Sequence, residues 1–307
     1  MTDKIHFARI AIVGAGLIGS SVARAIVRAG VAGTLAVTDK DEAVLAEARE
    51  LGFAHEFHDD AKKAVQDADL VILAVPVGAM ASVGAAIAPV LKAGAIISDV
   101  GSVKEGVFSA LEPLLPDTVH LIPGHPVAGT EQSGPSAGFA SLFDGRWCII
   151  TPPEAVDDEA LGRLTCFWEA LGSKVEIMTA KHHDLVLAIT SHVPHLIAYN
   201  IVGTASDLEE VTRSEVIKYS AGGFRDFTRI AASDPTMWRD VFLNNKEAVL
   251  EMLGRFSEDL TALQRAIRWG DGDALFDLFT RTRDIRRRII DAGQDEEAAD
   301  FGRHHKE

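Results

Sequence analysis

Cysteine is nearly absent from this chain of 307 residues, which contains only Cys148 and Cys166. Two cysteines do not make a disulfide framework, and such sparse use is typical of a reducing compartment. The N-terminal residues also lack the long apolar core and the small-residue cleavage site of a signal peptide. We therefore expect a cytoplasmic protein.

Positive charge is scarce as well. Lys and Arg together number 30 against 45 Asp and Glu, which gives a formal net charge of −15 at pH 7. A surface this negative repels phosphate backbones and anionic membranes, so we expect neither nucleic acid nor a membrane as a partner. Hydrophobic residues make up 47% and charged residues 24%, as in folded globular proteins, which excludes the disordered and low-complexity classes.

One uncharged run, from Leu70 to Leu91, is long enough to span a bilayer. Proline or glycine interrupts it at Pro76, Gly78, Gly84 and Pro89, and its first residues are continuously apolar, like a strand buried on both faces. We expect a strand, a turn and a packed helix here, and not a membrane span.

Short apolar runs alternate with helical patterns through the first half of the chain. We expect helices at about Leu17–Ala29, Glu42–Leu51 and Asp157–Leu171, and strands at ARIAIV, Leu35–Thr38, Leu70–Val75, Ala95–Asp99, His120–Ile122, Trp147–Thr151 and Lys174–Ile177, with a weaker one near Phe53–Phe57. This alternation predicts an α/β Rossmann-like, doubly wound and mostly parallel sheet. From Lys181 onward helical patterns dominate, which predicts an all-α C-terminal domain. The expected division is 1–179, an NAD-binding Rossmann-like domain; 180–295, a helical substrate and dimerisation domain; and 296–307, a polar tail.

A glycine-rich motif follows the first predicted strand and opens the first predicted helix, which is the context a dinucleotide-binding loop requires. It runs Gly14-Ala15-Gly16-Leu17-Ile18-Gly19. The first glycine permits the tight turn, the second admits a pyrophosphate to the backbone, and the third lets helix and strand pack closely. The residues of this loop are therefore predicted to bind a dinucleotide, although a nucleotide-free Rossmann domain remains an alternative.

Asp39 stands at the end of the second predicted strand, twenty residues after Gly19. A carboxylate there accepts hydrogen bonds from the hydroxyls of the adenine-side ribose and repels a 2′-phosphate. NAD is therefore favoured over NADP, while the adjacent Lys40 leaves NADP as the second option.

Polar residues also follow two later strands. Ser102 follows the Ala95–Asp99 strand in DVGSVK, and His125 follows the His120–Ile122 strand in GHPVAGTE, where Thr130 and Glu131 close the loop. In open α/β sheets ligands bind outside the carboxyl ends of the strands. A neutral imidazole held on a stiff turn beside a nicotinamide can accept a hydroxyl proton as a hydride leaves the same carbon.

The helical half contains two further groups of candidates. His192 and His195 have a spacing that metal ligands use, but no third ligand follows at helical spacing and Pro194 interrupts the helix, so we expect no metal site. Farther on, an arginine of GGFRDFTRIAASDPTMWRD can bind a substrate carboxylate, whereas Arg225 and Arg239 are expected to form surface ion pairs.

Five segments together resemble the prephenate/arogenate (cyclohexadienyl) dehydrogenase family of tyrosine biosynthesis: GAGLIGSS, DVGSVK, GHPVAGTEQSG, SHVPH and DFTRIAASDPTMWRD. They occur in order between Arg9 and Asn245. The resemblance implies a Rossmann domain, a helical domain through which two chains form a homodimer, and an active site in the cleft between the domains. It also implies NAD-dependent oxidative decarboxylation of prephenate or arogenate to 4-hydroxyphenylpyruvate or tyrosine, with release of CO2. A chorismate mutase extension and a regulatory ACT domain are not expected.

The resemblance also implies roles for single residues. His125 matches the catalytic base that takes the proton of the ring hydroxyl, and Ser102 matches a serine that hydrogen-bonds this histidine and the hydroxyl and lies beside the cofactor. Arg229 matches the arginine that binds a substrate carboxylate. Residues predicted to line the substrate pocket are His195, Trp238, Thr130 and Glu131.

Two alternatives stay open on the sequence. One is another two-domain NAD(P) dehydrogenase that acts on a hydroxyacid, which shares both domain types but is not expected to carry GHPVAGTE or DFTRIA. The other is a non-catalytic NAD-binding sensor, which has no need to keep Ser102, His125 and Arg229 together.

Overall fold

The computed structural model describes residues 6–212 and 221–290. By the density of their contacts, these residues divide into one unit that ends at Lys246 and a second that begins at Glu247. The predicted tail, 296–307, lies outside the described residues.

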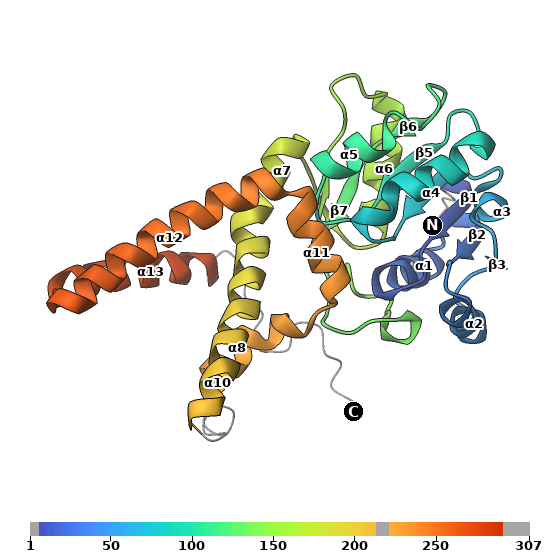
Figure 1. The fold of residues 1–307 in the computed structure, drawn as a ribbon. Coiled ribbons are helices and arrows are strands. Elements are labelled where there is room, and N and C mark those ends of the chain that lie inside the picture. Colours follow the sequence, from blue (N-terminus) through green and yellow to red (C-terminus); the bar gives the residue numbers. More distant parts are fainter. Residues whose placement is uncertain (1–5, 213–220, 291–307) are drawn as a thin grey trace. The chain divides into compact units, whose positions relative to one another are not determined.

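A six-stranded, wholly parallel sheet forms the centre of the first unit (Figure 1), in the order β3-β2-β1-β4-β5-β6. Its strands are β1 (Phe7–Val13), β2 (Ala32–Thr38), β3 (Glu56–His58), β4 (Leu70–Leu73), β5 (Ile96–Asp99) and β6 (His120–Leu121). The connecting helices are α1 (Leu17–Ala29), α2 (Glu42–Leu51), α3 (Ala61–Val65), α4 (Met80–Ile87) and α5 (Glu105–Leu111). The strand order reverses between β1 and β4, so this is the switch point at which doubly wound sheets bind ligands. The predicted α/β Rossmann-like fold is confirmed.

The central strands are apolar on both faces because each face packs against its own core. In β1, Ile10 and Ile12 belong to one buried cluster, whereas Ala11 and Val13 belong to the other. This follows from the alternation of side chains along a strand. The uncharged run after Leu70 forms β4, a short 3-10 turn and α4, as predicted.

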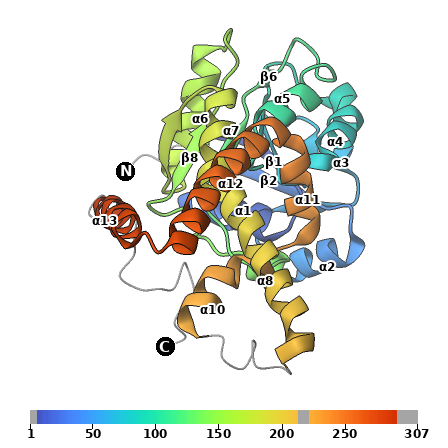
Figure 2. The same ribbon diagram turned by 60° about the vertical axis from the view of Figure 1, so that its left-hand side comes forward.

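A second, three-stranded sheet corrects one sequence expectation. The strands β7 (Gly124–Pro126), β8 (Trp147–Ile150) and β9 (Lys174–Ile177) form it in that order, with β7 antiparallel to β8. The later strands therefore do not extend the parallel sheet, and the GHP segment is a strand and not a turn. Helix α6 (Asp158–Ala170) packs beside β9 (Figure 2).

The chain is helical from Ala180 to Ile289 through the described residues, as predicted. The elements are α7 (Ala180–Leu187), a π-helix η4 (Ala188–His192), α8 (Val193–Thr212), α10 (Gly222–Thr228), the 3-10 turn η5 (Arg229–Ala232), α11 (Pro235–Asn244), α12 (Lys246–Trp269) and α13 (Gly272–Ile289). Asp234 caps α11 by accepting from the Met237 amide, with Pro235 in the first helical position. Pro194 explains the π-helix, because its ring would clash with the Thr190 carbonyl four residues earlier in a regular α-helix.

Candidate active site

The glycine loop lies between β1 and α1, and its three glycines differ in what surrounds them. Gly14 has a φ of +105°, and a Cβ on it would lie 2.3 Å from the Ala74 carbonyl oxygen. A Cβ on Gly19 would lie 1.9 Å from the Gly14 carbonyl oxygen, whereas a Cβ on Gly16 would meet nothing within 4 Å. Gly14 and Gly19 therefore serve the close packing of strand and helix, and Gly16 borders open space.

Helix α1 begins at this open space without a cap of its own. Gly16 provides no side-chain cap, and the first turn, which includes the half-buried Leu17 and Ile18, carries no acidic residue. The free amides and the positive end of the helix dipole are thus left for an anion. This arrangement fits the pyrophosphate of a dinucleotide.

Asp39 connects the end of β2 to the glycine loop. Its Oδ2 accepts from the Ala15 amide at 2.7 Å, and its Oδ1 accepts from the Asp41 amide at 2.9 Å. Each carboxylate oxygen has a second lone pair, so Asp39 can hold the loop and still accept a hydrogen bond from a ligand.

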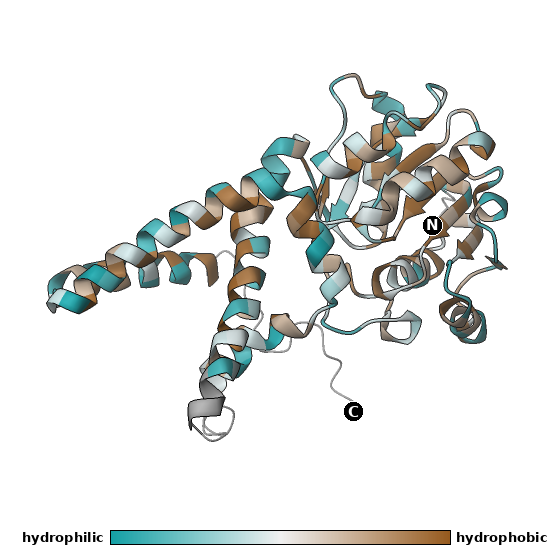
Figure 3. Cartoon of the chain, viewed as in Figure 1, coloured by the Kyte–Doolittle hydropathy of each residue, from teal (hydrophilic) through white to brown (hydrophobic). Residues whose placement is uncertain are grey.

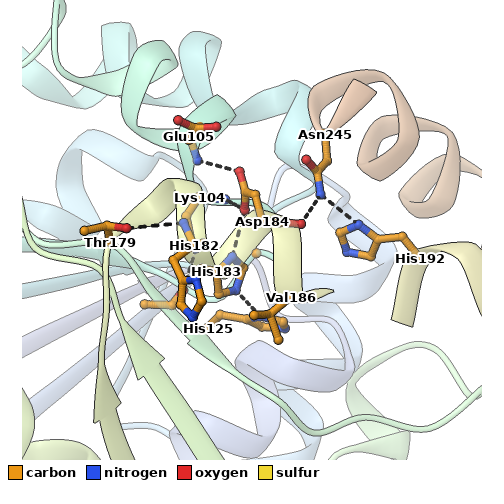
Figure 4. A network of polar contacts seen from close by, with 12 residues as sticks. Lys104, Glu105, His125, Thr179, His182, His183, Asp184, Val186, His192 and Asn245 are labelled. Atoms are coloured by element: carbon orange, nitrogen blue, oxygen red, sulfur yellow. Dashed lines mark hydrogen bonds and ion pairs between the residues drawn. The ribbon is translucent and has the colours of Figure 1, made fainter. Parts of the chain in front are cut away.

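His125 lies in β7, where it pairs with Ile149 of β8, and its side chain is buried. The Nδ1 atom of His125 is 2.8 Å from Nε2 of His183 in α7. The Nδ1 atom of His183 is in turn 2.7 Å from Oδ1 of Asp184. Two histidines and a carboxylate, drawn from two elements, therefore form one continuous chain of contacts (Figure 4).

Asp184 also binds the start of α5. Its Oδ1 accepts from the Lys104 amide at 2.8 Å and its Oδ2 from the Glu105 amide at 2.9 Å. The carboxylate thus joins α7 to the segment that directly follows Ser102. Asn245, the residue that follows α11, also holds Asp184, because its side chain donates to the Asp184 backbone carbonyl oxygen at 2.8 Å.

The Lys104 side chain is fully buried beneath this network. Its Nζ lies 2.5 Å from Oδ2 of Asp99, at the end of β5, and donates to the Gly124 carbonyl oxygen at 2.6 Å. Burial lowers the pKa of Lys104, and the Asp99 carboxylate opposes that shift. The ammonium group fixes the strand that carries His125 to the end of the central sheet.

His192 is the last residue of the π-helix. Nδ1 of His192 is 3.1 Å from Nδ2 of Asn245, and the ring is buried. His195, three residues later, donates from Nδ1 to the Ser191 carbonyl oxygen at 2.8 Å. Each ring is thus engaged separately, and in residues 6–212 and 221–290 no three His, Cys, Asp or Glu side chains group to hold a metal ion.

Trp238 joins the predicted substrate residues to the histidine network. It stacks on His195 with ring centroids 3.7 Å apart, and it meets the His192 ring edge-on at 6.1 Å. Its buried neighbours are Val103 and Val241. Because Val103 follows Ser102, this packing places the Ser102 segment beside the predicted pocket residues.

Arg229 begins η5, and its Nη1 lies 3.0 Å from Oε2 of Glu131. Thr130, the residue before Glu131, accepts from the Gln132 amide at 3.2 Å and so shapes the loop. The charge of Arg229 also contributes to lowering the pKa of His195, which burial lowers first. The predicted pocket residues are therefore brought together.

Burial dominates the electrostatics of the inner histidines. It lowers the pKa of His125 well below the usual 6.5, and charges at His183, Lys104 and His192 lower it further. Burial also lowers the pKa of His183, although its hydrogen bond to Asp184 opposes the shift. The same cause lowers the pKa of His192 to about 4. A neutral His125 at pH 7 is the form that a proton acceptor needs.

The sequence motifs predict His125 as a site residue, but they do not predict the residues that contact its ring. His183 and Asp184 are visible only as neighbours in an HHD triplet, and Lys104 is visible only as the last residue of DVGSVK. Within the described residues the Ser102 side chain makes no hydrogen bond to His125, so that contact stays a prediction. Arg225 and Arg239 form ion pairs with the adjacent Asp226 and Asp240, as predicted.

Two family models match the chain. The nucleotide-binding domain of prephenate dehydrogenase matches residues 22–177, and the dimerization domain of prephenate dehydrogenase matches residues 179–281. A cyclohexadienyl dehydrogenase of Zymomonas mobilis is 46% identical over 280 residues, which are 91% of this chain and 95% of that protein. A prephenate dehydrogenase of Bacillus subtilis is 31% identical over 278 residues, 90% of this chain and 75% of that protein.

A solved structure is similar over most of its length. It is the prephenate dehydrogenase of Aquifex aeolicus in complex with hydroxyphenyl propionate and NAD+, with a TM-score of 0.85 and 33% identity. The match covers 92% of this chain and 98% of that one.

Proposed function

Because the chain belongs to the prephenate dehydrogenase family, we propose that its prephenate/cyclohexadienyl dehydrogenase activity uses NAD, with His125 as the base. The observation that carries this proposal is the contact between Nδ1 of His125 and Nε2 of His183, which leaves the other ring nitrogen of His125 to face a substrate. The family identification replaces both alternatives that the sequence left open.

NAD fits the residues of the glycine loop. The open space at Gly16 and the uncapped start of α1 can take the pyrophosphate. The Asp39 carboxylate can accept hydrogen bonds from the adenine-side ribose. The Aquifex aeolicus structure, which contains NAD+, supports the same choice. When bound, NAD supplies a hydride acceptor at nicotinamide C4; NADP is disfavoured because Asp39 would repel its 2′-phosphate.

The substrate of the proposed reaction is a cyclohexadiene with a hydroxyl on one ring carbon and a carboxylate on the opposite one. His125 accepts the hydroxyl proton while that carbon gives up its hydride, and the ring carboxylate then leaves as CO2. Aromatisation of the ring drives the reaction, so the protein mainly has to orient the substrate, accept the proton and exclude water. Ser102 is proposed to hydrogen-bond the hydroxyl and to lie beside the cofactor.

Arg229 is proposed to bind a substrate carboxylate with charge-assisted hydrogen bonds. His195 and Trp238 would form the wall of the pocket, and Thr130 and Glu131 the loop that closes it. The stacking of His195 on Trp238 and the contact of Arg229 with Glu131 support this grouping.

Two chains are proposed to form a homodimer through the helical domain, with a domain boundary at residues 179 and 180. The start of the dimerization-domain match at residue 179 supports both statements. Large apolar side chains also stand exposed on α12 and α13, among them Trp269 at 72% and Phe276 at 70%. Figure 3 shows that hydrophobic residues recur along both helices. The stretch Ala180–Asp207 has the length and mean hydropathy, 1.5, of a membrane-spanning helix, and we assign its exposed apolar side chains to a protein interface instead.

Cytoplasmic localisation is proposed from the free thiols of Cys148 and Cys166. The deciding experiment for the function follows the absorbance of reduced nicotinamide with purified protein and NAD, with prephenate or arogenate as substrate. Turnover of either is expected, and the ratio of the two kcat/KM values names the preferred substrate. Binding of NAD without turnover of either substrate would contradict the proposal.

A further inference from the structure

The protonation of His125 can be derived from the contacts of its neighbours. Both carboxylate oxygens of Asp184 accept backbone amides, so the hydrogen in the 2.7 Å contact between Asp184 and His183 is on Nδ1 of His183. A neutral His183 then has a bare Nε2, which can only accept. The hydrogen in the 2.8 Å contact between the rings must therefore be on Nδ1 of His125, which leaves the lone pair on Nε2 of His125.

We propose that His183, held by Asp184, is a positioning residue that fixes His125 in the tautomer with a proton on Nδ1 and so keeps Nε2 of His125 free as the base. The inference rests on the proposed function, because it assigns a helper to the base named there. It concerns a residue that acts through His125 and not on the substrate.

The surroundings leave His183 little freedom. Its side chain is fully buried in α7, and its ring meets that of His125 edge-on, with centroids 5.0 Å apart and an interplanar angle of 72° (Figure 4). Asp184 is held in place by the Lys104 and Glu105 amides at the start of α5. The Asp184 carboxylate thereby fixes both the His183 ring, which contacts the proposed base, and the segment that carries Ser102, which is proposed to bind the substrate hydroxyl.

Protonation of the His125–His183 pair prevents His125 from acting as a base. The titratable groups around the two rings are Lys104 before α5, Asp184 in α7, His192 in η4 and Asp99 at the end of β5. Only His183 has a carboxylate on its ring, so it takes the first proton as the pH falls. Protonated His183 has no acceptor left for His125, whose remaining proton must then move to Nε2, where it blocks proton transfer. The two rings titrate as a unit, and the first proton on that unit ends activity.

Two substitutions of His183 distinguish a role in positioning His125 from a purely structural role in the fold. In His183→Gln the amide oxygen reaches the place of Nε2 and still accepts from His125, but the side chain cannot be protonated. In His183→Asn the shorter amide reaches only the place of Nδ1, so it keeps the contact with Asp184 and loses the one with His125. We expect His183→Asn to lose kcat by on the order of 10²–10⁴, the scale of a histidine base in the wrong tautomer, and His183→Gln to lose less than about tenfold.

The pH profile of kcat/KM is the second readout. Since His183 takes the first proton in the wild type, its replacement by glutamine leaves only His125, whose buried ring has no carboxylate to stabilise a proton, so the acid limb should move to lower pH. KM for both substrates and the affinity for NAD should stay within about threefold of wild type in both variants. A His183→Asn enzyme as active as His183→Gln, or an acid limb that does not move in His183→Gln, would overturn the positioning role.

Failure of the proposed function has a different signature. It would appear as a wild-type enzyme without turnover, or as a His125→Asn variant with unchanged kcat, whatever the His183 variants do. If the wild type is active and His125→Asn is not, the comparison of the two His183 variants tests the positioning role alone.

Discussion

Arg229 and Glu131, 98 residues apart in the chain, form an ion pair in which Nη1 lies 3.0 Å from Oε2. Both side chains are partly exposed, at 28% and 23%. The arginine proposed to bind a substrate carboxylate is thus already in contact with a carboxylate of the protein. A substrate that binds Arg229 has to compete with Glu131 or share the guanidinium with it.

This competition predicts opposite effects on substrate binding. Arg229→Ala should raise KM by about tenfold or more, because it removes a charge-assisted hydrogen bond. Glu131→Gln should lower KM, since it removes the competing charge. Steady-state kinetics with the preferred substrate measure both, and Arg225→Ala, which breaks an exposed ion pair nearby in sequence, is the matched control. An unchanged KM and kcat in Arg229→Ala would refute the binding role.

His125→Asn tests the proposed base. The Asn side chain can still donate to Nε2 of His183 from near the position of Nδ1, but it has no group at the position of Nε2. We expect kcat to fall by on the order of 10²–10⁴, the usual contribution of a general base, while KM changes little. Turnover within threefold of wild type would remove His125 from the mechanism.

The buried histidines also predict acid sensitivity of the fold. The pKa of His192 is lowered from 6.5 to about 4 in the folded protein, mainly by burial. Between these values the unfolded chain binds more protons, so the free energy of unfolding falls as the pH drops below about 6.5, by up to about 1.4 kcal/mol per pH unit for this group. Urea titrations from pH 7 to pH 4 measure the slope.

His192→Asn isolates this contribution, because its amide oxygen still accepts from Asn245 but does not titrate. The stability difference between wild type and this variant should shrink or reverse as the pH falls. His182→Asn, which replaces an exposed histidine ten residues earlier in the chain, is the matched control. Equal slopes in wild type and His192→Asn would contradict the buried neutral state of His192.

Local sequence signals determined the helices of the first half closely. The predicted spans Leu17–Ala29 and Glu42–Leu51 agree with the structure because each helix ends at a glycine in the left-handed conformation, Gly30 and Gly52, and Asp41 caps the second. Such caps act within a few residues, so a sequence reveals them.

The strand that carries His125 had no comparable signal. The segment Gly124–Pro126 is too short for an alternating pattern, and it becomes a strand only through its pairing with β8, more than twenty residues away. The partner of His125 is 58 residues away, and the sequence does not tell which ring nitrogen meets which. Lys104 was missed because lysine is almost always exposed, and its burial depends on contacts with the buried Asp99 carboxylate and the Gly124 carbonyl oxygen.

Asp39 should determine the choice of cofactor. Asp39→Asn keeps an acceptor for one backbone amide but removes the negative charge, so the preference for NAD over NADP should fall by about tenfold or more. The measurement is the ratio of kcat/KM for the two cofactors. Asp41→Asn is the control, because it removes a charge from the same turn while asparagine still caps α2. An equal change in both variants would show that Asp39 does not contact the ribose.

The glycine loop allows cofactor binding to be separated from folding. A methyl group on Gly19 would lie 1.9 Å from the Gly14 carbonyl oxygen, so Gly19→Ala should lower the free energy of unfolding by about 1–3 kcal/mol or more. A methyl group on Gly16 meets no protein atom within 4 Å, and the backbone there is compatible with alanine. Gly16→Ala should therefore cost less than about 1 kcal/mol of stability.

The same Gly16→Ala variant should bind NAD on the order of tenfold more weakly, because the methyl group occupies the approach of the pyrophosphate. Thermal melts without cofactor and fluorescence titrations with NAD measure the two properties separately. A stable Gly16→Ala protein with wild-type affinity would mean that the pyrophosphate does not pass over this glycine. A stable Gly19→Ala protein would mean that α1 can move away from β1, and the close contact between Gly19 and Gly14 would then not be what fixes the start of the helix.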